Sequence, residues 1–194
     1  GVAELLKDSQ KPGGLSIRNA VLPDVGQKDE AYVDMEQALQ AAGVEILYMG
    51  KGDVLKSDTL LMTCLWPESN LASDDRNEQS LVLLAEYGKF QMLLTGDIGA
   101  QAEKELAASG MLRPVELLKV AHHGSRHSST EAFLSQVQPE LSLISCSSTN
   151  RYGHPGEETL ERLKQTGSRT LITKDRGAIG VRTDGKKVWV KTWK

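Results

Sequence analysis

Three side chains that commonly bind metals lie just after apolar stretches of this sequence. Asp97 follows residues 91–95 after a single glycine, and His122 and His123 come directly after residues 117–121. Each stretch has the length and composition of a buried strand. Strands that end in a carboxylate and in imidazoles deliver these groups to one edge of a sheet, where ligands bind in open α/β sheets. Imidazole together with carboxylate suits a divalent ion such as Zn²⁺ or Mn²⁺.

A third segment, residues 152–155, adds His154 to this set. Each feature alone has an ordinary explanation, because an aspartate after a strand often forms a turn and a histidine is often satisfied by hydrogen bonds. Together they favour a metal site made of Asp97, His154 and the pair His122 and His123. His123 is either a further ligand or a residue that orients its neighbour's ring.

The elements that must position these residues alternate between strands and helices. Apolar periodicity and turn residues predict strands at 19–22, 44–48, 59–66, 80–86, 90–95, 117–121, 141–146, 170–173, 178–182 and 187–193. They predict helices at 1–9, 29–42, 100–109, from 131 onward and at 157–165. Ser128 and Glu131 have capping-box spacing. This order indicates a layered α/β fold with a mixed sheet.

The composition is ordinary for a globular protein, with 39% hydrophobic and 25% charged residues among 194. The formal net charge of −3 gives no global attraction to nucleic acid, so any such attraction must be local. No run approaches the roughly 18–20 apolar residues of a membrane span, and no signal peptide is visible. A helical pattern begins at Val2 without a capping residue, which predicts that the sequence is cut from a longer protein.

Four motifs follow one another along the chain: residues 77–83 (NEQSLVL), 93–97 (LLTGD), 118–125 (LKVAHHGS) and 150–155 (NRYGHP). In this order and spacing they resemble the C-terminal metallo-β-lactamase-like domain of ComEC-type DNA-uptake competence proteins. The resemblance covers most of the chain. It implies an α/β fold of four layers, an αβ/βα sandwich with two sheets back to back, helices outside and metals at one edge.

The resemblance also implies that part of the domain is missing. In the family, a His-x-Asp-x-Asp-His-x-Gly-Gly motif supplies most ligands of a metal pair, and Gly1 resembles its last glycine. We therefore expect residues 1–194 to form a single domain that lacks the N-terminal strands and the first metal motif. The complete domain would hold two divalent ions, Zn²⁺ or Mn²⁺. We expect this chain alone to bind metal weakly or not at all and to be inactive.

Residue by residue, the resemblance makes Asp97 a bridging ligand, and His122 and His154 further metal ligands. Asp97 and His122 are the expected catalytic residues. Ser125, Asn150 and Tyr152 match polar positions near the family's site, where they would hold a phosphate or orient water. The alternative for these three is turn chemistry, since loops contain such residues anyway. His127 we interpret as a loop residue rather than a base.

The function implied is a metal-dependent phosphodiesterase or nuclease that acts on DNA during uptake in competence. The implied partners are DNA and the rest of a membrane channel protein, and the implied location is the extracytoplasmic side of the bacterial cytoplasmic membrane. One alternative is a non-catalytic domain that guides DNA or associates with the channel. Another is an esterase that acts on a small phosphate ester.

The last predicted strand alternates charges with rings. Lys191 lies between Trp189 and Trp193, and Arg182 lies across the predicted hairpin. Basic residues beside aromatic ones can track a nucleic-acid backbone and stack its bases. We favour the other interpretation, an edge strand protected by lysines with its tryptophans packed on a helix.

Overall fold

A seven-stranded mixed sheet is the largest element of the structure, a computed structural model that describes residues 2–9, 11 and 13–194. In the order β3-β4-β5-β6-β7-β8-β9, neighbours are antiparallel from β3 to β6 and parallel from β6 to β9. The strands are β3 (Val54–Ser57), β4 (Leu60–Trp66), β5 (Val82–Tyr87), β6 (Phe90–Leu94), β7 (Leu117–Lys119), β8 (Leu141–Ile144) and β9 (Arg169–Ile172). Gly1, which was compared with the family's motif, lies outside the described residues.

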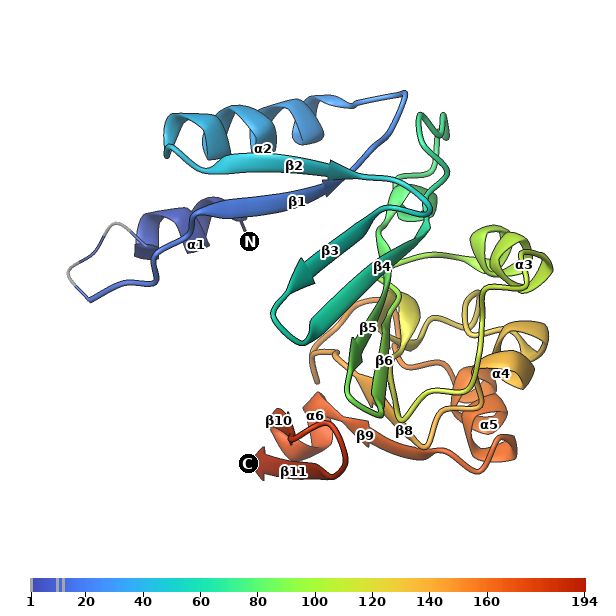
Figure 1. Cartoon of the computed structure of the whole chain (residues 1–194). Helices are drawn as coiled ribbons and strands as arrows, with labels where there is room; N and C mark the ends of the chain where they lie inside the picture. Colours follow the sequence, from blue (N-terminus) through green and yellow to red (C-terminus); the bar gives the residue numbers. More distant parts are fainter. Residues whose placement is uncertain (1, 10, 12) are drawn as a thin grey trace.

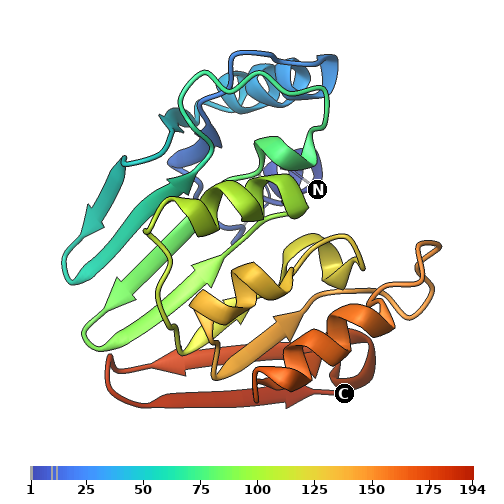
Figure 2. The same ribbon diagram turned by 90° about the vertical axis from the view of Figure 1, so that its right-hand side faces the viewer.

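Three helices cover one face of this sheet (Figures 1 and 2). They are α3 (Ala100–Ala108), α4 (Glu131–Val137) and α5 (Glu157–Gln165). Parallel strands need crossover connections, and these helices supply them between β6, β7, β8 and β9. Their apolar stripes bury Leu106, Phe133 and Leu163 against the sheet in one core cluster. This half of the molecule therefore holds the carboxyl ends of four parallel strands rigidly side by side.

The other face of the sheet is covered by a C-terminal hairpin, β10 (Ala178–Thr183) and β11 (Val188–Trp193). Ile179, Val181 and Val190 of the hairpin pack against a cluster that includes Phe90 and Leu171 of the sheet. The inward-facing residues alternate along each strand with outward-facing ones, as pleating requires.

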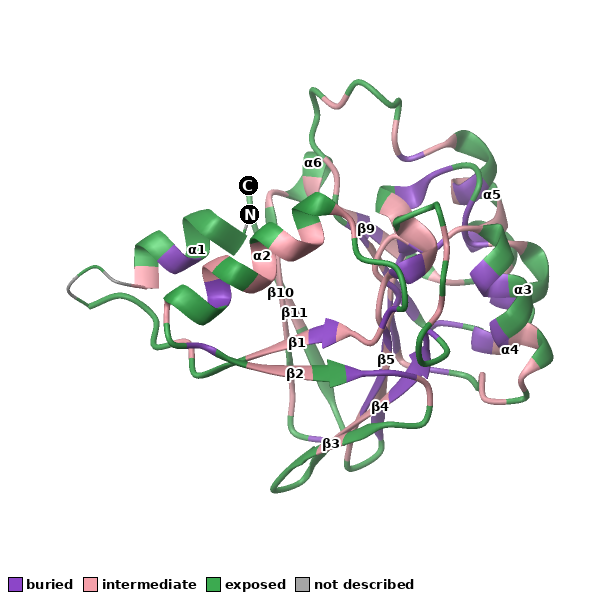
Figure 3. Cartoon of the chain, turned by 90° about the horizontal axis from the view of Figure 1, so that it is seen from above, coloured by how far each residue is buried: buried purple, intermediate pink, exposed green. Residues whose placement is uncertain are grey.

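A separate unit comes from the N-terminal segment. Strands β1 (Asn19–Pro23) and β2 (Glu45–Met49) pair in parallel, and helices α1 (Val2–Ser9) and α2 (Glu30–Ala41) cover one face of the pair (Figure 3). Asp29 caps α2 as predicted, since its side chain accepts a hydrogen bond from the backbone N–H of Tyr32. The seven-stranded mixed sheet with helices between its parallel strands confirms the predicted mixed α/β fold.

Four short elements were not predicted, and one predicted cap is wrong. Strand β3 is a four-residue edge strand whose residues are mostly exposed, so it lacks an alternating apolar pattern. Helix α6 (Thr173–Arg176) is a single turn between β9 and β10. The expected capping box at Ser128 and Glu131 does not form, because Thr130 is the N-cap of α4 and makes no side-chain cap. Two further short helices are of the 3-10 type, η1 (Asn77–Gln79) and η2 (Ala121–Gly124).

Candidate functional site

The candidate metal-binding side chains lie beyond the carboxyl ends of three adjacent parallel strands. Asp97 follows β6, His122 and His123 follow β7, and His154 lies in the loop after β8. The backbone joins the first two segments directly, since the N–H of His122 donates to the Gly96 carbonyl at 3.2 Å. The fold thus brings segments that are far apart in sequence to one edge of the sheet.

The chain turns sharply where it carries the two histidines. His122 and His123 have φ values of 47° and 55°, in the left-handed region that residues with a side chain rarely adopt, and Gly124 follows at 81°. A side chain at Gly124 would also collide with Pro155, because a Cβ there would lie 2.7 Å from the proline Cβ. Strained backbone of this kind clusters at functional sites, where surrounding contacts hold it in place.

The histidine rings form two close pairs. The ring centroids of His122 and His154 are 5.6 Å apart in an edge-to-face arrangement. The Nε2 atom of His123 lies 3.6 Å from Oδ2 of Asp97, and its Nδ1 lies 2.7 Å from the Ser145 carbonyl. His123, which sequence reasoning ranked below His122, is therefore in direct contact range of the aspartate. The left-handed turn at both histidines produces this arrangement, and no sequence pattern indicates it.

His154 is held in a state suited to ligation. Partial burial lowers the pKa of its imidazole below the usual value of 6.5, and the nearby His122 and His123 lower it further, while Asp97 opposes them. A neutral imidazole is the form that binds a metal ion. The same electrostatic environment shows that these four side chains lie close enough to influence one another.

The side chains of Asn150 and Ser125 make hydrogen bonds within their own loops. The amide nitrogen of Asn150 donates to the carbonyls of Ser147 and His154, and its oxygen accepts from the His154 N–H at 2.8 Å. The Ser125 side chain is buried and accepts from the His127 N–H at 3.3 Å. The predicted contact of Asn150 and Ser125 with a phosphate is not what this geometry favours, because turn hydrogen bonds occupy both groups. His127 lies in the turn and is exposed.

Tyr152, in contrast, is free to contact a ligand. Its side chain is 80% exposed and its ring stacks on His154, with centroids 5.7 Å apart and planes inclined by 16°. A pocket of about 270 Å³ lies beside it, lined by His123, Ser145, Cys146, Ser147, Asn150, Tyr152 and His154. This pocket opens directly onto two of the candidate ligands.

Lys119 is a site residue that sequence reasoning missed. Its ammonium donates to the Gly96 carbonyl at 3.2 Å and lies 3.9 Å from Oδ1 of Asp97. Burial lowers the pKa of Lys119, and the carboxylate of Asp97 opposes that effect. The sequence offered one signal for this role. Lys119 is a charged residue within an apolar run, two residues before the expected end of the strand.

Glu103 of α3 is a second residue that was missed, and it supports the loop after the histidines. Its buried carboxylate accepts hydrogen bonds from the backbone N–H groups of Ser129 and Thr130, the latter at 2.7 Å. It thereby caps α4 from another helix. Arg162 of α5 donates to the carbonyls of the same loop, including that of Ser129 at 2.7 Å. Burial raises the pKa of Glu103, and its hydrogen bonds to the loop oppose this shift.

The donor set fits a divalent ion in kind but is small in number. Asp97 and the three imidazoles supply the oxygen and nitrogen ligands of zinc or manganese sites. Within the described part of the chain, no three His, Cys, Asp or Glu side chains are arranged as ligands of one ion. A catalytic zinc ion generally has three protein ligands. A complete site therefore needs donors beyond those that converge here.

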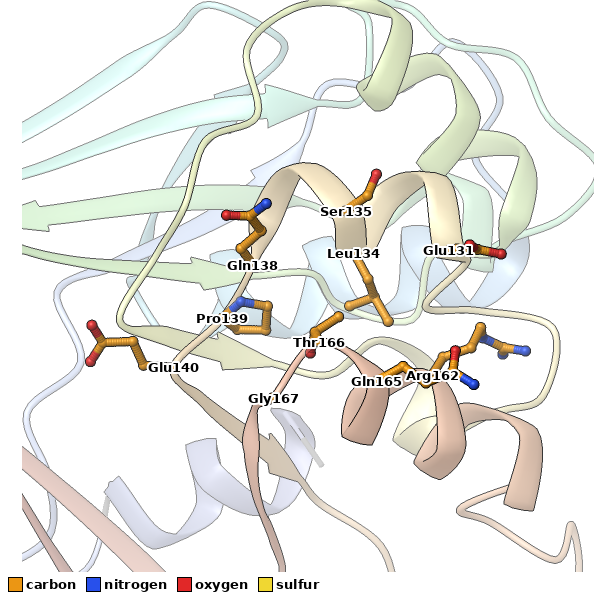
Figure 4. Close-up of a pocket in the computed structure, with 10 residues that line it drawn as sticks. All are labelled: Glu131, Leu134, Ser135, Gln138, Pro139, Glu140, Arg162, Gln165, Thr166 and Gly167. Atoms are coloured by element: carbon orange, nitrogen blue, oxygen red, sulfur yellow. The ribbon is translucent and has the colours of Figure 1, made fainter.

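A larger pocket, of about 670 Å³, lies away from this edge between α4 and α5 (Figure 4). Its walls carry Glu131, Gln138, Glu140 and Thr166. The Arg162 guanidinium at its rim is engaged by loop carbonyls. The pocket contains none of the candidate ligands, so its size does not make it the site.

Among the described residues, no helix is long and apolar enough to span a membrane.

No protein-family model matches the chain. Curated relatives do match it. ComE operon protein 3 of Bacillus subtilis is 35% identical over 182 residues, which cover 94% of this chain and 23% of that protein. Recombination protein 2 of Haemophilus influenzae is 36% identical over 58% of this chain and 14% of its own length. Competence protein ComA of Neisseria gonorrhoeae is 32% identical over 61% of this chain and 18% of its own length. The chain thus spans less than a quarter of each relative.

Solved structures resemble the chain only distantly. A proposed metal-dependent hydrolase from Parabacteroides distasonis has a TM-score of 0.45 at 11% identity, over 82% of this chain and 78% of that one. The diiron β-hydroxylase CmlA from Streptomyces venezuelae has a TM-score of 0.47 at 9% identity, over 77% of this chain and 37% of that one. At these scores the likeness carries no argument about chemistry. The sequence relatives confirm the family resemblance drawn from the motifs: the chain is homologous to part of these proteins and belongs to the ComEC family.

Proposed function

We propose that this chain provides part of a divalent-metal site that hydrolyses phosphodiester bonds of DNA during uptake. The observation that carries the proposal is the convergence of Asp97, His123, His122 and His154 beyond three adjacent parallel strands. The relative named for competence, together with the family resemblance, supports DNA as the substrate class. We also propose, from the family resemblance, that the domain works on the extracytoplasmic side of the membrane beside the rest of a channel protein.

Asp97, His122 and His154, with His123 as a further donor, would hold the metal. A bound divalent ion lowers the pKa of water and neutralises charge that develops on a phosphate. The chain's own residues prepare this environment. Burial lowers the pKa of His154, which favours its neutral form; the Lys119 ammonium adds positive charge beside Asp97, and Tyr152 offers an exposed ring at the pocket mouth.

The roles of the polar residues follow from their contacts. Asn150 fixes the loop of His154, and Ser125 fixes the turn after His123, so we assign both to positioning rather than to substrate binding. Tyr152 keeps its assignment to substrate binding, because its ring is exposed and stacked beside a candidate ligand. Asp97 and His122 keep their assignment as catalytic residues.

A nuclease assay tests the proposal. Full-length protein is incubated with a labelled single-stranded oligonucleotide in Mn²⁺, in Zn²⁺ and in a chelator, and a small phosphodiester is run in parallel. We expect cleavage of the oligonucleotide that depends on the metal and stops with the chelator. Equal cleavage in chelator contradicts metal dependence. Preference for the small ester shows an esterase instead.

We infer a second candidate function, a domain that guides DNA without hydrolysing it; the exposed ring of Tyr152 beside the candidate ligands suits DNA contact with or without cleavage. Full-length protein that binds DNA but shows no cleavage with any divalent ion supports this second function.

A further inference from the structure

The outward face of the terminal hairpin carries two half-exposed tryptophans. Trp189, Lys191 and Trp193 alternate along β11 and therefore share one face. Arg182 of β10 lies directly opposite Trp189. The indoles are 49% and 52% exposed, whereas Val190 between them packs inward on the large sheet. We call the set Arg182, Trp189, Lys191 and Trp193 the hairpin face.

The two tryptophans, which we expected to pack on a helix, stay half exposed. The ring of Trp193 lies instead against Gly180 of the neighbouring strand, where an added Cβ would be 2.8 Å from the indole. Only a residue without a side chain leaves room for this ring. The Lys191 ammonium lies 5.0 Å from the centroid of the same ring. A stiff, two-stranded backbone thus presents aromatic rings and cations together.

The charge of this segment opposes that of the rest of the chain. Residues 178–194 contain five basic residues and one acidic residue, a net charge of +4, so the preceding residues must carry −7 to give the total of −3. A local positive surface on an otherwise acidic chain attracts anions by local contacts rather than by the overall field. The exposed indoles add aromatic surfaces on which a base can stack, and an inorganic anion has no such base.

We propose that the hairpin face binds single-stranded nucleic acid. Arg182 and Lys191 would contact phosphates while Trp189 and Trp193, roughly 13 Å apart at the usual strand rise, would each stack a base. Bases must be unstacked to reach such rings, which favours a single strand over a duplex. The inference rests on the proposed function only in its choice of nucleic acid as the partner. It involves neither a metal ion nor any residue of the candidate site.

Fluorescence titration with an oligothymidylate in a chelator tests this binding directly. Trp66 is buried, so quenching reports mainly on the two exposed indoles. We expect quenching on addition of single strand, and at least about tenfold weaker binding for the Trp189→Ala, Trp193→Ala double variant, measured by anisotropy of a labelled strand. Replacement of both tryptophans by phenylalanine keeps a stacking ring and is expected to retain most of the affinity.

Charge reversal supplies the second arm. Arg182→Glu with Lys191→Glu should weaken binding and reduce the slope of log K against log salt by roughly 1.4, the value for two lost contacts to a single strand. The matched control is Lys104→Glu with Lys164→Glu, two exposed lysines on α3 and α5 over the opposite face of the sheet. This control should bind as the unmodified chain does.

Four results would overturn the inference. Three concern binding: no binding in chelator, equal losses for the hairpin and control variants, or duplex binding that is insensitive to the tryptophans. The fourth is self-association that disappears in the tryptophan variants, which would assign the face to a second copy of the chain. Binding in chelator that persists when the nuclease assay shows no cleavage separates this inference from the proposed hydrolysis.

Discussion

The candidate metal edge and the hairpin face present functional side chains in opposite ways. At the metal edge, strained backbone and loop hydrogen bonds fix each side chain, as the left-handed histidines and the Asn150 amide show. On the hairpin face, the backbone is a regular ladder and the two indoles are half exposed. The difference indicates that the first region suits chemistry, which needs donors held in place, and the second suits tolerant binding along a flexible polymer.

The contrast between the two regions is contradicted most clearly if Asp97 is dispensable for activity. In full-length protein, Asp97→Ala should lower metal-dependent cleavage by more than about 100-fold, because loss of a ligand costs more than loss of a residue that orients one. Initial rates on a labelled oligonucleotide measure this. The control is Asp34→Ala, an exposed aspartate on α2. Retention of most activity by Asp97→Ala would show that the carboxylate does not hold the metal.

A stability measurement compares the two regions directly. Glu103→Gln should destabilise the chain by about 1–3 kcal/mol, because two backbone N–H groups at the start of α4 lose a charged acceptor. Urea unfolding gives the free energy, and Glu105→Gln on the exposed side of the same helix is the control. Trp189→Ala, on the hairpin face, should cost less than about 1 kcal/mol. Equal losses of unfolding free energy in the Glu103 and Trp189 variants would contradict this difference between the metal edge, whose loops are held by hydrogen bonds, and the hairpin face.

Loss of the hydrogen bonds that hold the loop of His154 should have a smaller effect on activity. Asn150→Ala removes the hydrogen bonds that close the loop around His154 and should reduce metal-dependent cleavage about tenfold while the protein stays folded. The readout is activity against metal concentration, which should shift to higher metal. A change in rate at saturating metal, with no shift in metal dependence, would show that Asn150 contacts substrate as first expected.

The smallest effect concerns protonation. Since burial lowers the pKa of folded His154, the unfolded chain binds the extra proton first as pH falls. The contribution of His154 to the stability of the folded form should therefore be complete above pH 6.5. It should be lost as the pH falls through the lower pKa of the folded state. An NMR titration of the imidazole protons should give a midpoint for His154 below 6.5. A midpoint above that value would contradict the described environment.

Much of this arrangement was readable in the sequence. Apolar stretches that stop at Asp97 and His122 predicted strands that end in candidate ligands, and the helices at 100–109 and 157–165 implied the crossovers that make those strands parallel. The proximity of His123 to Asp97 was not readable, because it depends on left-handed backbone at two consecutive histidines. Glu103 caps a helix that begins far from it in sequence, so no local pattern reveals its role.

The half exposure of the two tryptophans was not readable in the sequence for a related reason. The alternation of charges and rings in the last strand fits both a packed edge and a binding face. What separates them is which face of the hairpin meets the sheet, and that depends on the packing of Ile179, Val181 and Val190 over residues distant in sequence. Tertiary packing of this kind is outside the reach of periodicity within one strand.

The most direct test of the metal assignment is paramagnetic broadening of the chain's NMR signals by Mn²⁺. The method detects even weak binding, which is what we expect from a chain with few converging ligands. Our account predicts that signals of Gly96, Asp97, His122, His123 and His154 broaden first, and that Asp97→Ala suppresses this. Broadening centred elsewhere, or unchanged in Asp97→Ala, would contradict the assignment of the metal site to this edge.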